Sequence, residues 1–169
     1  GALITLTRKA GLDPATRDAD YPEIKEYAFD SGRKRMSSVR TYNGKQCLFV
    51  KGAPESIIEL STKLWDHTFT RKMTVNDTKR LLAYHEEHAA GAQRNLAFAY
   101  RVLPAGFDAR KQPLEDAEKE LTFLGIASMV DPLREEVPAA MVAARRAHMS
   151  VSIVTGDFAP TARAIAGRA

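Results

Sequence analysis

Three kinds of residue that could bind a nucleotide lie in the first third of the chain. They are an aromatic residue, Phe29, a run of cations, Arg33-Lys34-Arg35, and Lys51 in the segment K-G-A-P-E. An aromatic face can stack on a base, and cations can pair with phosphates. The same residues also fit a plainer interpretation, in which Phe29 is a core residue, the cations form a solvated turn and Lys51 is an ordinary surface lysine.

The elements around these residues would place Lys51 at the end of a strand. Residues 35–50 read as two strands joined at Asn43-Gly44, and Asn-Gly between β-formers is a strong hairpin signal because both turn residues must accept a positive φ. The return strand leads into Lys51 and then into Gly52-Ala53-Pro54-Glu55, where the proline and the adjacent carboxylate predict the start of a helix. A rigid sheet would therefore aim the Lys51 ammonium group.

Composition places the chain among ordinary globular proteins. Its 169 residues suffice for one good core or two small ones, with 44% hydrophobic and 27% charged residues. The net charge of +4 and pI near 9.3 suit an anionic ligand without singling out nucleic acid. The single Cys47 excludes an internal disulfide, and no apolar run approaches the roughly 18–20 residues of a membrane span. Because the chain begins without Met or a signal-peptide pattern, we expect a fragment of a longer protein.

The hydrophobic pattern predicts an α/β fold in two parts. Residues 1–125 read as an antiparallel sheet with flanking helices. Residues 126–169 read as part of a doubly wound parallel α/β unit, because two apolar strands alternate with helices. The predicted strands are at 24–29, 35–50, 95–103, 121–130 and 151–154, and the predicted helices are at 1–10, 54–64, 74–90, 133–148 and from 160.

Four motifs in a fixed order give the chain a specific resemblance. They are F-x-x-x-R-K-x-M from Phe29 with K-G-A-P-E from Lys51, Q-R-N-L-A-F-A around Arg94 and Leu96, D-P-L-R at 131–134, and T-G-D at 155–157. Over almost its whole length the sequence resembles P-type cation-transporting ATPases of the calcium-pump and sodium-pump kind. The resemblance implies an N-terminally truncated nucleotide-binding domain in residues 1–125 and part of the HAD-like phosphorylation domain in residues 126–169.

The same resemblance implies roles for single residues. Phe29 would stack on adenine, with Lys51 and Gly52 in the same pocket, while Lys34 would face the nucleotide. Arg94 would reach the phosphates from the strand that also carries Leu96. The residues expected near the γ-phosphate of the complete pump are Asp131, Arg134, Thr155, Gly156 and Asp157.

Departures from the family pattern limit these roles. Ser31 stands where the family often has an arginine, and Leu133 replaces the second proline of the D-P-P-R hinge. The chain has neither D-K-T-G-T, whose aspartate accepts the phosphoryl group, nor a downstream G-D-G-x-N-D. Covalent catalysis needs that nucleophile. We therefore expect a fragment that binds ATP or ADP and presents ATP to an aspartate absent from this chain, without hydrolysing ATP or transporting an ion itself.

For the complete protein, the resemblance implies ATP hydrolysis coupled to cation transport, with Mg²⁺ as cofactor and calcium as the first candidate ion. The chain would be a cytoplasmic domain of an integral membrane protein without direct membrane contact. Its partners would be ATP or ADP and the actuator, phosphorylation and membrane domains of the pump. Because truncation would uncover apolar strands, we expect residues 126–169 either to be mobile or to pair with a second copy in a non-native dimer.

Alternatives from other classes stay open. A basic nucleic-acid-binding module would explain the pI and the three consecutive cations, although the chain lacks a basic strand interleaved with aromatics. A fragment of a soluble HAD-type phosphatase would explain the T-G-D segment but lacks the acceptor aspartate. His85 and His88 in H-E-E-H are three residues apart, whereas zincin histidines are four apart, so the sequence predicts no metal site.

Overall fold

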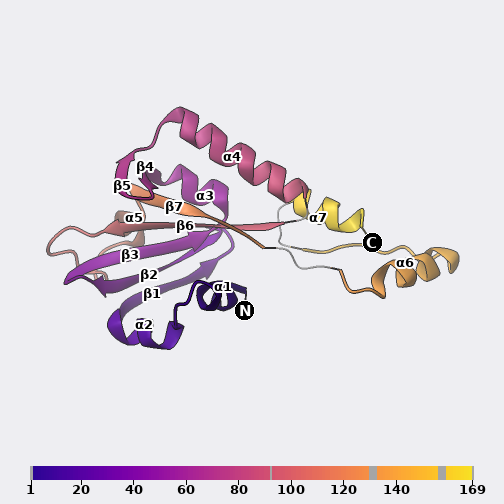
Figure 1. Ribbon diagram of the computed structural model, residues 1–169, viewed down its shortest axis with the longest axis horizontal. Helices are drawn as coiled ribbons and strands as arrows, with labels where there is room; N and C mark the ends of the chain where they lie inside the picture. The colour runs from indigo at the N-terminus through magenta and orange to yellow at the C-terminus, as the bar shows by residue number, and fades with distance from the viewer. Residues whose placement is uncertain (1, 92, 130–132, 156–158, 169) are drawn as a thin grey trace. The chain divides into compact units, whose positions relative to one another are not determined.

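A mixed seven-stranded sheet is the centre of the computed structural model, which describes residues 2–91, 93–129, 133–155 and 159–168 (Figure 1). The strands lie in the order β1-β2-β3-β6-β7-β4-β5. Their bounds are β1 Glu23–Asp30, β2 Arg35–Tyr42, β3 Lys45–Gly52, β4 Ser61–Asp66, β5 Phe69–Lys72, β6 Arg94–Val102 and β7 Leu121–Met129. This confirms an α/β sheet with flanking helices.

One pair of strands corrects the prediction of an antiparallel sheet. The pairs β1-β2, β2-β3, β3-β6 and β4-β5 are antiparallel, but β4 and β7 pair in parallel, with Leu64 opposite Phe123. A parallel pair needs a long crossover connection. The chain between β4 and β7 supplies one, because it includes β5, a long helix and β6.

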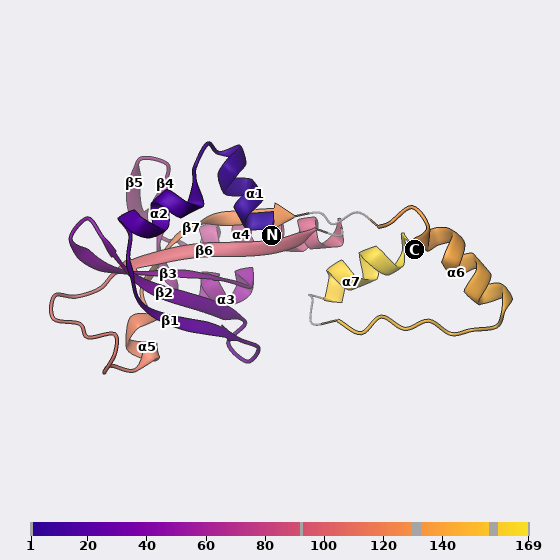
Figure 2. The same cartoon turned by 90° about the horizontal axis from the view of Figure 1, so that it is seen from below.

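Seven helices, short except for α4, accompany the sheet within the described residues. They are α1 Ala2–Lys9, α2 Pro14–Asp20, α3 Pro54–Glu59, α4 Val75–Ala90, α5 Leu114–Ala117, α6 Val137–Arg146 and α7 Ala159–Ala166. In both views, α3 lies on one side of the sheet and α1 and α2 lie on the other (Figures 1 and 2). No helix in these described ranges is long and apolar enough to cross a membrane.

The hairpin that carries Lys51 forms as predicted. Asn43 and Gly44 have φ values of 49° and 72°, so both turn residues are left-handed, as a two-residue turn of this kind requires. Side chains on one face of the hairpin enter the core, where Val39, Leu48 and Val50 are at most 3% exposed. Ile57 and Ile58 of α3 are also at most 3% exposed, so this helix and the sheet share one core.

The helix predicted at 54–64 is shorter than expected. It ends at Glu59, and β4 begins at Ser61, whose hydroxyl donates to the carbonyl of Ile57 at 2.7 Å. Leu64, which the helical pattern placed on an apolar stripe, is buried at its pairing position opposite Phe123. Pairing with a buried strand therefore overrides the local helical pattern after Glu59.

The described residues form two compact units. The first comprises Gly1–Thr78 and Leu96–Ile126, and the second comprises Lys79–Asn95 and Ala127–Ala169. In the second unit the predicted strand at 151–154 is wrong, because these residues pair with no strand and Val154 is 98% exposed. A strand needs a neighbour to satisfy its backbone groups. The described part of this unit therefore contains helices α6 and α7 but no doubly wound parallel sheet.

Candidate functional site

One row of paired residues crosses four strands and organises the candidate site. Asp30 pairs with Arg35, Arg35 with Gly52, and Gly52 with Ala97. The predicted residues Phe29, Lys34, Lys51 and Leu96 each stand immediately before one member of this row. Four predicted residues from three separate segments of the chain are thus brought to one end of the sheet.

Lys51 emerges between two apolar side chains. It pairs with Met36 on β2 and with Phe98 on β6, and paired residues project from the same face of a sheet. All three side chains are half-buried. Leu96 lies two residues before Phe98 on β6, so it projects from the same face, and it is also half-buried. The Lys51 side chain therefore shares a face of the sheet with three half-buried apolar side chains, a surface that suits a flat aromatic ligand with a polar edge.

Gly52 lets two strands approach very closely. A Cβ atom at this position would lie 2.5 Å from both the Arg35 Cβ and the Lys34 carbonyl oxygen. Backbone atoms cannot move away cheaply, so no side chain fits there. The missing side chain of Gly52 therefore allows the turn before β2 to sit directly against β3, while the role of Gly52 in the pocket stays a prediction.

Phe29 and Lys34 lie on either side of the turn between β1 and β2: Phe29 is the penultimate residue of β1, and Lys34 is the last residue of the turn. Phe29 is 65% exposed, which leaves its ring open to a ligand. Lys34 has a φ of 54°, and its backbone is fixed by hydrogen bonds from Lys34 N to Asp30 O at 2.7 Å and from Ala53 N to Lys34 O at 2.9 Å. Its Nζ lies 3.3 Å from a carboxylate oxygen of Glu55.

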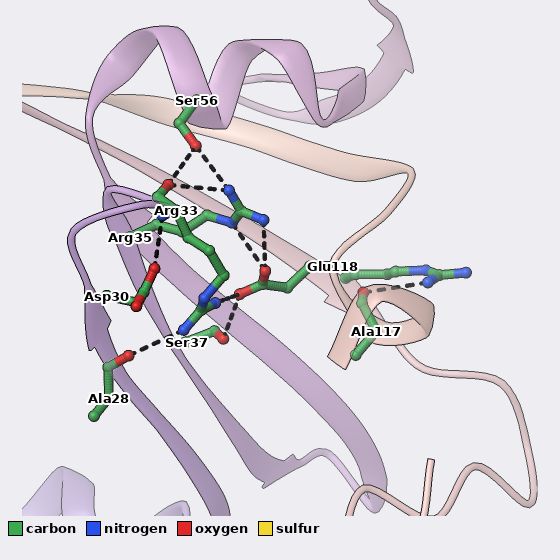
Figure 3. Close-up of polar contacts among 9 residues, drawn as sticks. Ala28, Asp30, Arg33, Arg35, Ser37, Ser56, Ala117 and Glu118 are labelled. Carbon is green, nitrogen blue, oxygen red and sulfur yellow. Dashed lines mark hydrogen bonds and ion pairs between the residues drawn. The ribbon is translucent and has the colours of Figure 1, made fainter. Parts of the chain in front are cut away.

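A buried carboxylate, Glu118, engages the other two cations of the run (Figure 3). Its side chain is 2% exposed; one oxygen accepts from Arg33 Nη1 at 2.9 Å, and the other accepts from Arg35 Nε at 2.9 Å and lies 2.8 Å from Arg35 Nη2. Ser37 Oγ donates to the first oxygen at 2.7 Å. Arg33 and Arg35 are therefore engaged in a structural ion-pair network, and phosphate binding by the run of three cations stays a prediction.

Sequence reasoning missed Glu118 for a simple reason. It lies 85 residues after Arg33 and 83 after Arg35, so no local spacing connects them. The only signal in the sequence is that three consecutive cations are too many to bury without an anionic partner. Beside Glu118, Tyr27 donates its hydroxyl to Ala109 O at 2.9 Å, and burial, followed by the charges of Glu118 and Glu115, raises the pKa of this phenol.

Of the remaining predicted site residues, three lie in the part of the chain that the structure describes and three do not. Arg94 is the exposed first residue of β6. Arg134 and Thr155 are exposed and lie in irregular segments. Asp131, Gly156 and Asp157 lie outside the described residues. The grouping of these residues near the γ-phosphate therefore stays a prediction.

The two histidines of H-E-E-H have separate surroundings. His85 is buried, and its Nδ1 lies 2.9 Å from Asn95 Nδ2, whereas His88 stacks on Tyr84 with ring centroids 3.8 Å apart. In the part of the chain that the structure describes, no three His, Cys, Asp or Glu side chains gather as a metal site would require. His85 and His88 therefore each contact a different neighbouring side chain.

Comparison with known proteins identifies the family. Residues 1–136 match the family described as "P-type ATPase, cytoplasmic domain N". The chain is 35% identical over 168 residues to a calcium-transporting ATPase of Bacillus subtilis, and 31% identical over 165 residues to calcium-transporting ATPase 1 of Lactococcus lactis; each alignment covers 98% of this chain but only 18% of the relative. It is also 36% identical over 158 residues to the calcium-transporting ATPase PAT1 of Dictyostelium discoideum, covering 87% of this chain and 14% of that protein. The chain therefore belongs to the P-type ATPases, and specifically to the family of their cytoplasmic N domain.

Proposed function

We propose that this chain recognises ATP by its adenine ring. The observation that carries the proposal is the row across four strands, which places exposed Phe29 at the same end of the sheet as Lys51 and Leu96. Phe29 would stack on the base, and Met36 and Phe98 would give the pocket around Lys51 its apolar character. Stacking of one base on an aromatic side chain is worth about 1–3 kcal/mol.

The phosphates would be held loosely. Of the three consecutive cations, Glu118 engages Arg33 and Arg35, which leaves Lys34 as the one that could face a nucleotide. Arg94 is exposed at the start of β6 and is the second candidate, proposed from its motif. A loosely held triphosphate suits a domain that presents ATP for a reaction elsewhere, because tight phosphate contacts would have to be broken before transfer.

In the complete protein, the presented ATP would phosphorylate an aspartate outside this chain. Residues 126–169 would be part of the phosphorylation domain, with Asp131, Arg134 and the segment Thr155-Gly156-Asp157 near the γ-phosphate. Mg²⁺ would bind in that complete site. Because the printed names of the relatives quoted above specify calcium transport, we propose calcium as the transported ion and the cytoplasmic domains of the same pump as partners.

A nucleic-acid-binding function is the second candidate, and the structure weakens its basis. Its main support was the basic run, and two of those three cations share an ion pair with one buried carboxylate, which offsets one of their two charges. Binding to nucleic acid falls steeply with salt because phosphate contacts release counterions. Adenine stacking should change little between low and moderate salt, so one salt series separates the two functions.

Titration of the chain with ATP, followed by calorimetry or NMR chemical shifts, tests the proposal. The dissociation constant should be on the order of 0.1–1 mM, since a single stacking contact supplies most of the free energy. Removal of Mg²⁺ should change it little, because the proposed contacts are made mainly to the adenine ring and not to the metal-binding phosphates. Submicromolar affinity, or a strict need for Mg²⁺, would place the site elsewhere.

Substitutions identify which part of ATP each residue contacts. Phe29→Ala should weaken ATP and ADP by the same factor, at least about fivefold, because the lost stacking is common to both. Lys51→Ala should act in the same way, whereas Arg94→Ala should weaken ATP more than ADP. Phe69→Ala is the matched control, since Phe69 is 56% exposed on β5, an edge strand remote from β1 in the strand order. Equal binding by the parent and Phe29→Ala would contradict the proposal.

A further inference from the structure

We propose that Glu118 is a positioning residue for the adenine pocket and acts on Phe29 through Arg33. The inference rests on the proposed nucleotide function and adds a residue that no motif marks. Glu118 does not reach the ligand face, because its side chain is 2% exposed. Its effect would be to fix the backbone that presents the Phe29 ring.

Arg33 holds the chain on both sides of Phe29. Its Nη2 donates to the carbonyl oxygen of Ala28 at 3.0 Å, directly before Phe29. Its backbone N donates to Asp30 Oδ1 at 2.8 Å, directly after Phe29. Its Nη1 donates to Glu118 at 2.9 Å, so the guanidinium group that reaches Ala28 is itself anchored by a buried charge (Figure 3).

Arg35 forms a second branch that secures the same turn. Its Nη1 donates to the carbonyl oxygen of Arg33 at 3.1 Å and to Ser56 Oγ at 3.0 Å, while Ser56 Oγ also donates to Arg33 O at 3.0 Å. Both arginine side chains therefore converge on Glu118, and the side chain of Arg35 also binds the backbone of Arg33. Because Ser56 belongs to α3, this branch also ties the turn to the helix that follows Lys51 and Gly52.

Glu118 is held rigidly enough to serve as an anchor. It caps the end of α5, where its backbone N donates to Leu114 O at 2.9 Å. Arg101 on β6 donates to the carbonyl oxygens of Asp116 and Ala117 at 2.7 and 3.2 Å, which secures the last turn of α5 to the sheet. A fixed carboxylate can restrict the motion of two arginines, and pre-organisation of this kind lowers the entropy that a ligand must remove on binding.

The test compares Glu118→Gln and Arg33→Gln, singly and together, for affinity towards ATP and adenosine at a temperature where each variant is folded. Each single substitution should weaken both ligands about five- to tenfold and by the same factor, since the loss acts on base stacking. The double variant should bind about as weakly as either single variant, because both changes break one connection.

A purely electrostatic role gives a different result. If Glu118 merely offset the charge of its two arginines, Glu118→Gln would strengthen ATP relative to adenosine. Asp77→Asn is the control for lost stability alone, because Asp77 is also buried and forms a two-point ion pair with an arginine, Arg71. Its folded fraction should bind both ligands like the parent.

The outcomes separate the two proposals. If Phe29→Ala weakens the parent but Glu118→Gln and Arg33→Gln bind both ligands as the parent does, the positioning role is refuted and the proposed function stands. If the parent shows no binding that depends on Phe29, both fail. Should Glu118→Gln not fold, Arg33→Gln decides alone, since it leaves the ion pair between Arg35 and Glu118 in place.

Discussion

Gly52 is the residue at which the candidate site depends most directly on sterics. Gly52→Ala should destabilise the chain by about 1–3 kcal/mol, the usual cost of overpacking, because the new Cβ would lie 2.5 Å from backbone and Cβ atoms of the preceding turn. Urea unfolding measures this change in stability. Gly52→Ala should also weaken ATP binding, since the displaced turn carries Lys34 and lies beside Phe29.

A second strand glycine provides the control for Gly52. Gly125 lies in β7, and a Cβ at that position would meet no atom within 4 Å. Gly125→Ala should therefore change stability by no more than about 0.5 kcal/mol, or stabilise slightly by restricting the unfolded chain. Equal losses from the two substitutions would show that the close approach at Gly52 is relieved without cost.

Residues whose roles depend on local sequence were the ones that could be predicted. Lys51 was placed correctly at a strand end because the Asn43-Gly44 turn and Pro54 bracket its strand on both sides. The partners of Arg33 and Arg35 could not be predicted, because the carboxylate that binds them lies more than 80 residues away. An ion pair between residues so far apart leaves no local spacing in the sequence.

At the level of single elements, the start of α4 combines a cap with an ion pair. Thr74 Oγ1 accepts from Asp77 N at 3.1 Å, while an oxygen of Asp77 accepts from Thr74 N at 3.0 Å, so each side chain satisfies the other's backbone. Arg71 on β5 donates to both Asp77 oxygens, at 2.6 and 2.8 Å. The hydrogen bonds from Arg71, and then those from Thr74, hold the pKa of the Asp77 carboxyl far below its ordinary value.

This cap should make stability depend on pH in acid. The folded pKa of Asp77 lies below the unfolded value of about 3.8, so its contribution is complete above that pH and is lost as pH falls towards the folded value. Urea unfolding from pH 6 down to pH 2 should therefore show a steeper acid loss for the parent than for Asp77→Asn. Parallel curves would mean that this carboxylate titrates normally in the folded chain.

Element types were predicted better than their ends. The strong amphipathic pattern of α4 and the hairpin turn between β2 and β3 gave elements that the structure confirms. The predicted end of α3 was wrong because Leu64 fits the apolar stripe of a helix as well as the buried face of a strand, and pairing with β7 decides between them. The strand predicted at 151–154 failed for the converse reason, since its apolar residues have no strand beside them.

At the scale of the whole molecule, the two units should differ in protection from solvent. Residues 151–155 are exposed and irregular, whereas β3 is paired on both sides and largely buried. Hydrogen exchange should therefore be fast for amides in 151–155 and slow for those in β3. Light scattering on the same sample tests for pairing with a second copy. Strong protection of 151–155 in a monomeric sample would show that this segment finds a strand partner within its own chain.

The long separation between Arg33 and Glu118 also bears on how the protein is made. Ribosomes add about 5–20 residues per second, so the 85 residues that separate the pair take on the order of 4–17 seconds to synthesise. During that interval the nascent chain carries two arginines whose counter-ion does not yet exist. The hydrogen bonds that tie the turn after Phe29 to Glu118 can form only after the segment before β7 has emerged, so a growing chain completes the proposed nucleotide pocket late, well after every residue of K-G-A-P-E is in place.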